Sequence, residues 1–222
     1  MSTQDYFKYW GKYDDETKGY HLLPFHSLDV AAVGQFLLKE DRPLTIDLAA
    51  FLDLPPAQLS GLFVFALALH DLGKFASAFQ KLRDSDDTAL IKGECRCSYD
   101  STNYRHDRLG WYFWEDSWKS FFEQKVCHGQ EQKVAKEQIR TVKKAFDILM
   151  NCVLGHHGKP VKPVKKVKAK AYTEPKNLDA AYCFIKDVCE LLCPDFPLEK
   201  FCDRNVHKII CTFTPSEASH YN

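Results

Sequence analysis

The chain contains a run of eight apolar residues, 62–69, that is followed directly by His70 and Asp71. The run is rich in Leu, Phe and Ala and lacks Pro, which predicts a buried helix over residues 62–74, although a buried strand also fits the pattern. An imidazole beside a carboxylate can bind one metal ion, or Asp71 can bridge two. Lys74, three residues further on, is expected on the same face as Asp71. The alternative is a structural His that is hydrogen-bonded to the neighbouring Asp.

Further His residues lie at the ends of other expected elements. A helix after Pro24 is expected to turn one face inward, and that face carries His26, Val30, Val33 and Leu37. His106 falls in the first turn of a helix that Asn103 could cap and whose aromatic residues, 111–114, belong to the core. The charged stretch 123–144 is expected to be a solvated helix or loop. A separate apolar helix, residues 145–154, then ends at the segment Gly155-His156-His157-Gly158.

Five imidazoles and one carboxylate therefore form a candidate metal-binding set, contributed by His26, His70, Asp71, His106, His156 and His157. Imidazole with carboxylate suits Mn, Fe, Co, Ni or Zn. The set exceeds what one catalytic ion needs and fits two ions bridged by a carboxylate, an arrangement that supports displacement at phosphorus. A structural zinc site built from Cys95, Cys97, Cys127 and His128 is the less favoured alternative, because the chain has no CxxC pair.

Charge and hydropathy restrict how the protein can contact nucleic acid or a membrane. The chain has 222 residues, of which 45% are hydrophobic, and its 30 basic residues balance 30 acidic ones. Any contact with nucleic acid must therefore be local. A candidate is the segment 159–170, with six Lys and two Pro, read either as an extended phosphate track for single-stranded DNA or as a solvated loop. We expect a cytoplasmic protein without membrane contact, because neither a signal peptide nor a long apolar span is evident.

Four separated motifs occur in an order that resembles the HD nuclease domain of the type I CRISPR-associated helicase–nuclease. They are His26 in the segment 21–32, His70-Asp71 in a Leu-His-Asp-Leu-Gly-Lys context, His106, and the Gly-His-His-Gly segment, preceded by a Tyr-Trp-Gly-Lys start at residues 9–12. The resemblance covers residues 6–160. It implies one all-α HD domain over residues 1–222 that cleaves single-stranded DNA with divalent metal ions. Its implied partners are the RNA-guided surveillance complex and a helicase domain or subunit.

The same resemblance implies a role for each candidate residue. Asp71 would bridge two ions, His26 and His70 would hold one, and the other would be held by His106, His156 and His157. Lys74 would face the scissile phosphate, so that Asp71 and Lys74 are the catalytic candidates.

The C-terminal part departs from the family pattern. Family members carry a last metal-binding Asp, in a context like Ser-Leu-Ala-Asp-Trp, and no such motif occurs here; Asp187 and Asp203 are poor substitutes. We therefore expect a domain truncated before its last motif, with single or substoichiometric metal occupancy, impaired cleavage and marginal stability. The alternatives are a catalytically inactive binding module of the interference machinery and an HD-type nucleotide phosphohydrolase.

Overall fold

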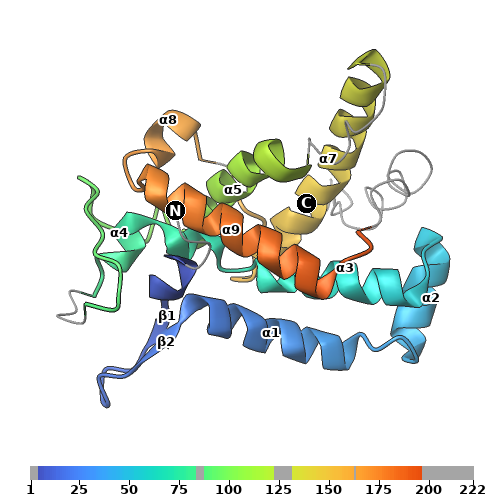
Figure 1. Ribbon diagram of the computed structural model, residues 1–222, viewed down its shortest axis with the longest axis horizontal. Coiled ribbons are helices and arrows are strands. Elements are labelled where there is room, and N and C mark those ends of the chain that lie inside the picture. Colours follow the sequence, from blue (N-terminus) through green and yellow to red (C-terminus); the bar gives the residue numbers. More distant parts are fainter. Residues whose placement is uncertain (1–4, 84–87, 123–131, 163, 197–222) are drawn as a thin grey trace, which may run out of the picture.

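The computed structural model describes residues 5–83, 88–122, 132–162 and 164–196 (Figure 1). It is an assembly of helices with one small hairpin, as the predicted all-α fold class requires. The elements, in chain order, are η1 (Asp5–Lys8), β1 (Trp10–Tyr13), β2 (Tyr20–Leu22), α1 (Leu23–Leu37), α2 (Pro43–Leu52), α3 (Pro56–Ala68), η2 (Leu72–Phe75), α4 (Ser77–Gln80), α5 (His106–Ser117), the π-helical η3 (Trp118–Phe122), α7 (Gln132–Leu154), α8 (Lys166–Ala169) and α9 (Pro175–Leu192).

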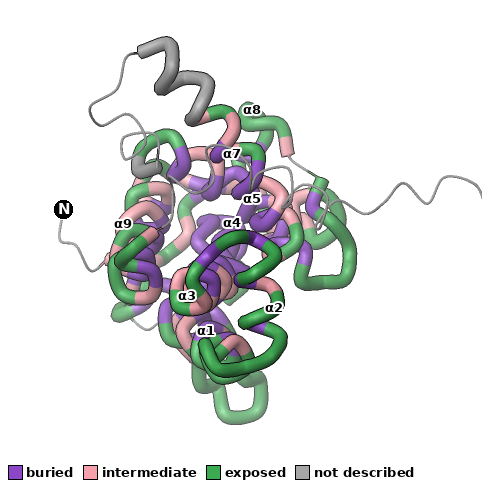
Figure 2. Tube along the Cα trace, turned by 90° about the vertical axis from the view of Figure 1, so that its right-hand side faces the viewer, coloured by how far each residue is buried: buried purple, intermediate pink, exposed green. Residues whose placement is uncertain are grey.

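The core lies where α3 and η2 pass between the other helices. α3 packs against α1, α2, α7 and α9, and η2 packs against α5 and α9. Figure 2 shows buried residues in the middle of the molecule and exposed residues along the outer sides of α1 and α2. Aromatic side chains fill much of this core, including Phe65, Phe75, Phe113, Trp114 and Phe184. The aromatic run that the sequence assigned to the core is therefore confirmed.

The helix expected over residues 62–74 does not continue beyond Ala68. α3 already begins at Pro56 and ends at Ala68, and η2 resumes only at Leu72, so His70 and Asp71 lie in the connection between the two. Gly73, in η2, lies against the start of α5, where a Cβ would approach the backbone oxygen of His106 to 1.7 Å. Only Gly permits such a close contact between η2 and the start of α5.

The inward face predicted for α1 is also wrong beyond its first turn. His26 is buried, but Val33 and Leu37 are each 60% exposed. The buried side of α1 carries small residues instead, among them Ala31 and Gly34, which let the helix lie close to α3. Apolar residues occur on both sides of this helix, so an apolar period in the sequence does not by itself tell which side is buried.

Two helix boundaries differ from expectation. α5 begins at His106 with Arg105 as its N-cap residue and no side-chain cap, so Asn103 does not cap it. α7 runs without interruption from Gln132 to Leu154, which joins part of the expected charged segment to the expected apolar helix. The charged positions 123–131 lie outside the described residues.

The aromatic N-terminal segment packs onto the helices through Tyr9 and Trp10, which are 0% and 5% exposed. It then forms the antiparallel hairpin β1–β2, which the sequence did not predict, and β2 leads directly into α1. Within the described residues, no single helix meets the length and apolarity of a membrane span. The segments Pro43–Leu52 and Pro56–Phe75 meet that test only as a pair, with a bend of 99° between them.

Candidate metal centre

The six candidate ligands come from four parts of the chain that converge at one place. His26 is in the first turn of α1, and His70 and Asp71 form the connection between α3 and η2. His106 opens α5, and His156 and His157 lie in the turn that follows α7. The structure places these side chains in two groups of three whose candidate ligand atoms lie within 4.8 Å of one another in each group.

We call His26, His70 and Asp71 the inner group, because all three are buried. His26 Nε2 lies 3.0 Å from Asp71 Oδ2, and His70 Nε2 lies 3.1 Å from the same oxygen. His70 Nδ1 donates a hydrogen bond to the carbonyl oxygen of Leu67 at 2.9 Å. That bond fixes the tautomer in which the Nε2 lone pair of neutral His70 is available to a metal ion.

Lys74 belongs to the same buried cluster. Its Nζ lies 2.8 Å from Asp71 Oδ2 and donates to the carbonyl oxygen of Gly11 in β1 at 2.8 Å. The expected proximity of Lys74 and Asp71 is present, although the segment is not one continuous α-helix. The Lys74 ammonium thus ties the hairpin to the inner group and places a positive charge beside its only carboxylate.

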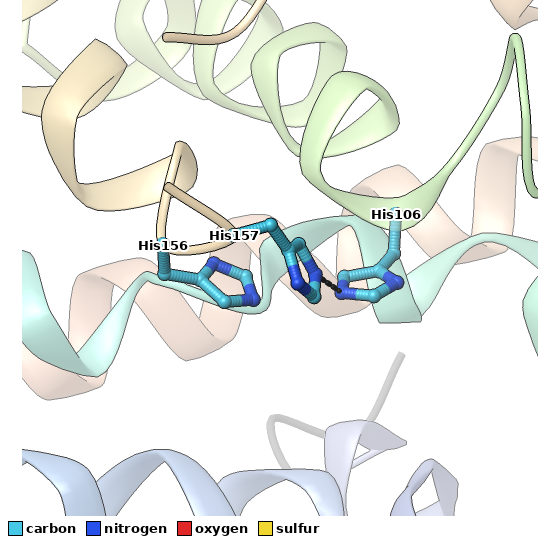
Figure 3. A group of neighbouring side chains, drawn as sticks. All are labelled: His106, His156 and His157. Carbon is cyan, nitrogen blue, oxygen red and sulfur yellow. Dashed lines mark hydrogen bonds between the residues drawn. The ribbon is translucent and has the colours of Figure 1, made fainter. Parts of the chain in front are cut away.

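We call His106, His156 and His157 the outer group; Figure 3 shows His106 and His157 turned toward each other, with His156 beside them. The Nε2 atoms of His106 and His157 are 3.0 Å apart. The hydroxyl of Tyr99 lies 3.0 Å from His106 Nδ1 and also accepts a hydrogen bond from the backbone N–H of His106. Tyr99 therefore orients the His106 ring from the side opposite to the candidate ligand atom.

Asp71 lies between the two groups, with one carboxylate oxygen toward each. Oδ2 faces His26 and His70, whereas Oδ1 lies 3.4 Å from His106 Nε2 and 3.6 Å from His156 Nε2. Oδ1 is buried and has no hydrogen-bond partner among the described residues. A buried carboxylate oxygen without a partner is costly unless a cation or another donor binds it. This orphaned atom is the strongest local sign that the centre fits a metal ion.

The protonation states also fit metal ligands. Burial lowers the pKa of His106 to about 4, and burial likewise lowers the pKa of His156, so both rings are neutral at pH 7. Burial opposes ionisation of Asp71, but its contacts with His26 and His70 and the charge of Lys74 outweigh burial and hold the pKa of Asp71 far below its usual range. Neutral imidazoles around an ionised carboxylate are the forms that bind divalent ions.

The thiol alternative gains no support within the described ranges. Cys95 Sγ lies 3.1 Å from the backbone oxygen of Cys97, and neither thiol belongs to a metal-capable group there. Cys127 and His128 lie outside the described residues.

Of the two acids considered as a last carboxylate, Asp187 is not in the centre. Asp187 lies on α9 and accepts a hydrogen bond from the hydroxyl of Tyr6 at 2.7 Å, and Asp203 and the positions of the missing motif lie outside the described residues.

Two residues that sequence reasoning missed support the centre directly. They are Tyr99, through its bond to His106, and Gly11, through its bond to Lys74. Tyr99 sits in a polar loop without periodicity, and Gly11 acts through its backbone, so neither carries a local signal.

Comparisons with known proteins indicate the family of this chain. The chain matches the family model described as Cas3, HD domain, over residues 10–211. Similar solved structures include T. fusca Cas3, with 17% identity and a TM-score of 0.59 over 92% of this chain and 22% of that chain. Another is titled CRISPR RNA-guided surveillance complex, pre-nicking, with 18% identity and a TM-score of 0.58 over 92% of this chain and 24% of that one.

These identities show a shared fold, and the chain spans roughly a fifth of the length of T. fusca Cas3 crystallised with ATP. No match is found among curated proteins. The family match extends over most of the chain and includes every residue of the inner and outer groups. The chain therefore belongs to the family of Cas3 HD domains.

Proposed function

We propose that this chain is a divalent-metal-dependent nuclease domain that hydrolyses phosphodiester bonds of single-stranded DNA in CRISPR defence. The observation that carries the proposal is the position of Asp71, whose two carboxylate oxygens face two separate groups of imidazoles. Two ions about 3.5–4 Å apart, sharing one carboxylate, are the usual arrangement for in-line displacement at phosphorus.

Some residues of the centre would bind the metal ions, and Lys74 would stabilise negative charge on the phosphate. His106, His156 and His157 with Asp71 Oδ1 would hold one ion, and His26, His70 and Asp71 Oδ2 the other. Ions of Mn, Fe, Co or Ni bound there would supply Lewis acidity for the attack of water on the phosphodiester. Lys74 holds its ammonium beside Asp71, where it can offset negative charge that develops on the phosphate.

The two ion positions are not equivalent. The outer group offers three imidazoles and an unpaired carboxylate oxygen, which makes a four-ligand set. In the inner group, Lys74 already occupies the side of Asp71 Oδ2 at 2.8 Å and repels a second cation. We therefore propose tight binding of one ion in the outer group and weaker binding of a second in the inner group. This asymmetry also favours single occupancy at low metal concentration.

A local basic surface adjoins the outer group and would bind the DNA backbone. The segment 159–170 begins two residues after His157, and Arg108 Nε donates a hydrogen bond to the backbone oxygen of Lys162 at 3.1 Å. The segment is not extended throughout, because Lys166–Ala169 form α8, and Lys166 lies 3.7 Å from Glu115. Several exposed cations still remain in a chain of zero net charge, as a local phosphate track requires.

The proposed partners are single-stranded DNA, the RNA-guided surveillance complex and a helicase domain or subunit. Support comes from the family assignment and from a structural neighbour whose title names the surveillance complex. A soluble, cytoplasmic location fits those partners.

The test is cleavage of a fluorescently labelled single-stranded oligonucleotide by the purified chain with Mn²⁺, Co²⁺ or Ni²⁺ added separately. We expect metal-dependent cleavage that EDTA abolishes and that Asp71→Asn reduces at least about 1,000-fold. DNA binding without cleavage under all metals would favour an inactive binding module. Hydrolysis of mononucleotides in preference to DNA would favour a nucleotide phosphohydrolase.

A further inference from the structure

We propose that an exposed aromatic shelf beside the inner group binds a base of the DNA strand next to the scissile phosphate. The shelf consists of Phe25 in α1, His21 in β2 and Lys12 in β1. The inference rests on the proposed function, since it assigns a second contact surface for the same single-stranded substrate. It concerns the side of the metal centre formed by α1 and the hairpin, whereas the basic segment adjoins the outer group.

The shelf is fixed by the way the hairpin enters α1. Phe25 is 48% exposed although it immediately precedes the buried ligand His26. The rings of His21 and Phe25 are nearly parallel, with an interplanar angle of 13° and centroids 6.4 Å apart. The ring of Phe7 lies 5.6 Å from that of Phe25 and supports it from the protein side. Phe25 is therefore held in place while about half of it stays open to solvent.

The shelf is continuous with the metal centre. The centroid of the His21 ring is 6.3 Å from that of His26, whose Nε2 contacts Asp71. A ligand that lies on His21 and Phe25 is therefore one ring away from an inner-group residue. This separation suits a nucleotide whose phosphate is at the ions and whose base reaches sideways.

The chemistry of the shelf fits a base with its attached phosphate. Aromatic rings bind single-stranded DNA by stacking on bases, without strong sequence preference. Lys12 pairs with His21 across the hairpin and is exposed, so it adds a positive charge beside the rings. Asp29 lies 3.7 Å from His21 Nδ1, where it can orient the imidazole; it is the acidic group next to the shelf. One cation, two ring faces and the carboxylate of Asp29 therefore line the surface that a DNA strand would meet here.

Phe36 provides a matched control on the same helix. It is 58% exposed, similar to Phe25, but eleven residues further along α1, about 16 Å away. Its ring is already covered by cations, with Lys39 Nζ at 5.3 Å and the Arg42 guanidinium at 5.2 Å. Substitution of Phe36 therefore measures the effect of losing an exposed Phe from α1 while the shelf stays intact.

The experiment measures binding of a fluorescein-labelled 12-nucleotide oligo-dT by anisotropy, with metal chelated so that no cleavage occurs. An abasic oligonucleotide of equal length has the same phosphates and no bases. We expect Phe25→Leu, which retains apolar contact with Phe7, to weaken oligo-dT binding about 5-fold or more. Abasic binding should not change, Phe25→Tyr should restore oligo-dT binding, and Phe36→Leu should behave as the unaltered chain.

A second measurement does not depend on the variants folding. An oligonucleotide containing 5-bromodeoxyuridine is cross-linked to the unaltered chain by ultraviolet light, and the attached residue is mapped by mass spectrometry. Attachment at Phe25 or His21 supports the shelf.

Cross-links confined to other regions would overturn the shelf, and so would equal binding of oligo-dT by Phe25→Leu and the unaltered chain. Equal weakening of oligo-dT and abasic binding would also overturn it, because the contact would then not involve a base. If metal-dependent cleavage by the unaltered chain persists in these cases, the proposed function stands. If the unaltered chain neither binds nor cleaves oligo-dT, the proposed function fails and the shelf fails with it.

Discussion

The inner and outer groups both present imidazoles to the candidate metal centre, but they differ in how the fold holds them. The inner group is buried, and its imidazoles and Lys74 converge on one oxygen of Asp71. The outer group comes from the first residue of α5 and the turn after α7, is more exposed, and contains imidazoles alone. Asp71 is buried and contacted by three side chains of its surroundings, whereas in the outer group Tyr99 orients the ring of His106.

The largest effect should come from Asp71, because both groups share it. Asp71→Asn keeps the size of the side chain but removes the charge, so both ions should be lost and cleavage should fall at least about 1,000-fold. Metal content after gel filtration and the cleavage rate check this. If metal content is unchanged in Asp71→Asn, the His70-Asp71 pair is structural and the two groups are independent.

Acidification should affect the outer group next. His106 has a pKa of about 4 in the folded chain and about 6.5 when unfolded, so the unfolded chain binds more protons between these values. Stability of the metal-free chain is therefore fully present above pH 6.5 and falls by roughly 3 kcal/mol as pH drops to 4. Urea unfolding at several pH values measures the loss. The His106→Gln variant should show a smaller dependence over this range, and an equal dependence would assign the effect elsewhere.

A substitution of Lys74 tests the effect of its positive charge on cleavage separately from metal binding. Because its ammonium competes for Asp71 Oδ2, Lys74→Met should retain metal and bind the second ion more tightly. Cleavage should nevertheless fall about 100-fold, since a positive charge near the reacting phosphate is lost. Calorimetric Mn²⁺ titration and single-turnover cleavage test the two effects. Weaker metal binding in Lys74→Met would contradict the competition and assign Lys74 a purely structural role.

The smallest effect is expected from the support of the outer group. Tyr99→Phe removes the hydroxyl that orients His106, which should lower affinity for the first ion about 10-fold. The inner group has no contact with Tyr99 in the described structure, so affinity for the second ion should change little. Equal loss at both positions would show that the two groups are more tightly coupled than their separate contacts suggest.

The sequence identified the residues that converge at the candidate metal centre better than the elements that carry them. His26, His70, Asp71 and the outer imidazoles could be singled out as candidates because polar side chains next to apolar runs are conspicuous. The outward face of α1 could not be predicted from the sequence. Val33 and Leu37 follow an apolar period but are exposed, and it is Gly34 that lies against Leu67 of α3. The close approach of Gly73 to His106 joins segments that are far apart in the sequence. Such contacts between distant segments leave no local pattern.

The central claim is that Asp71 joins a tight outer ion to a weaker inner one. Anomalous diffraction from crystals soaked in graded concentrations of Mn²⁺ tests it most directly, because each ion is located among named ligands. We predict a first peak between His106, His156, His157 and Asp71 Oδ1, and a second, at higher concentration, beside His26, His70 and Asp71 Oδ2, about 3.5–4 Å from the first. A first peak in the inner group, or two ions that do not share Asp71, would contradict the account.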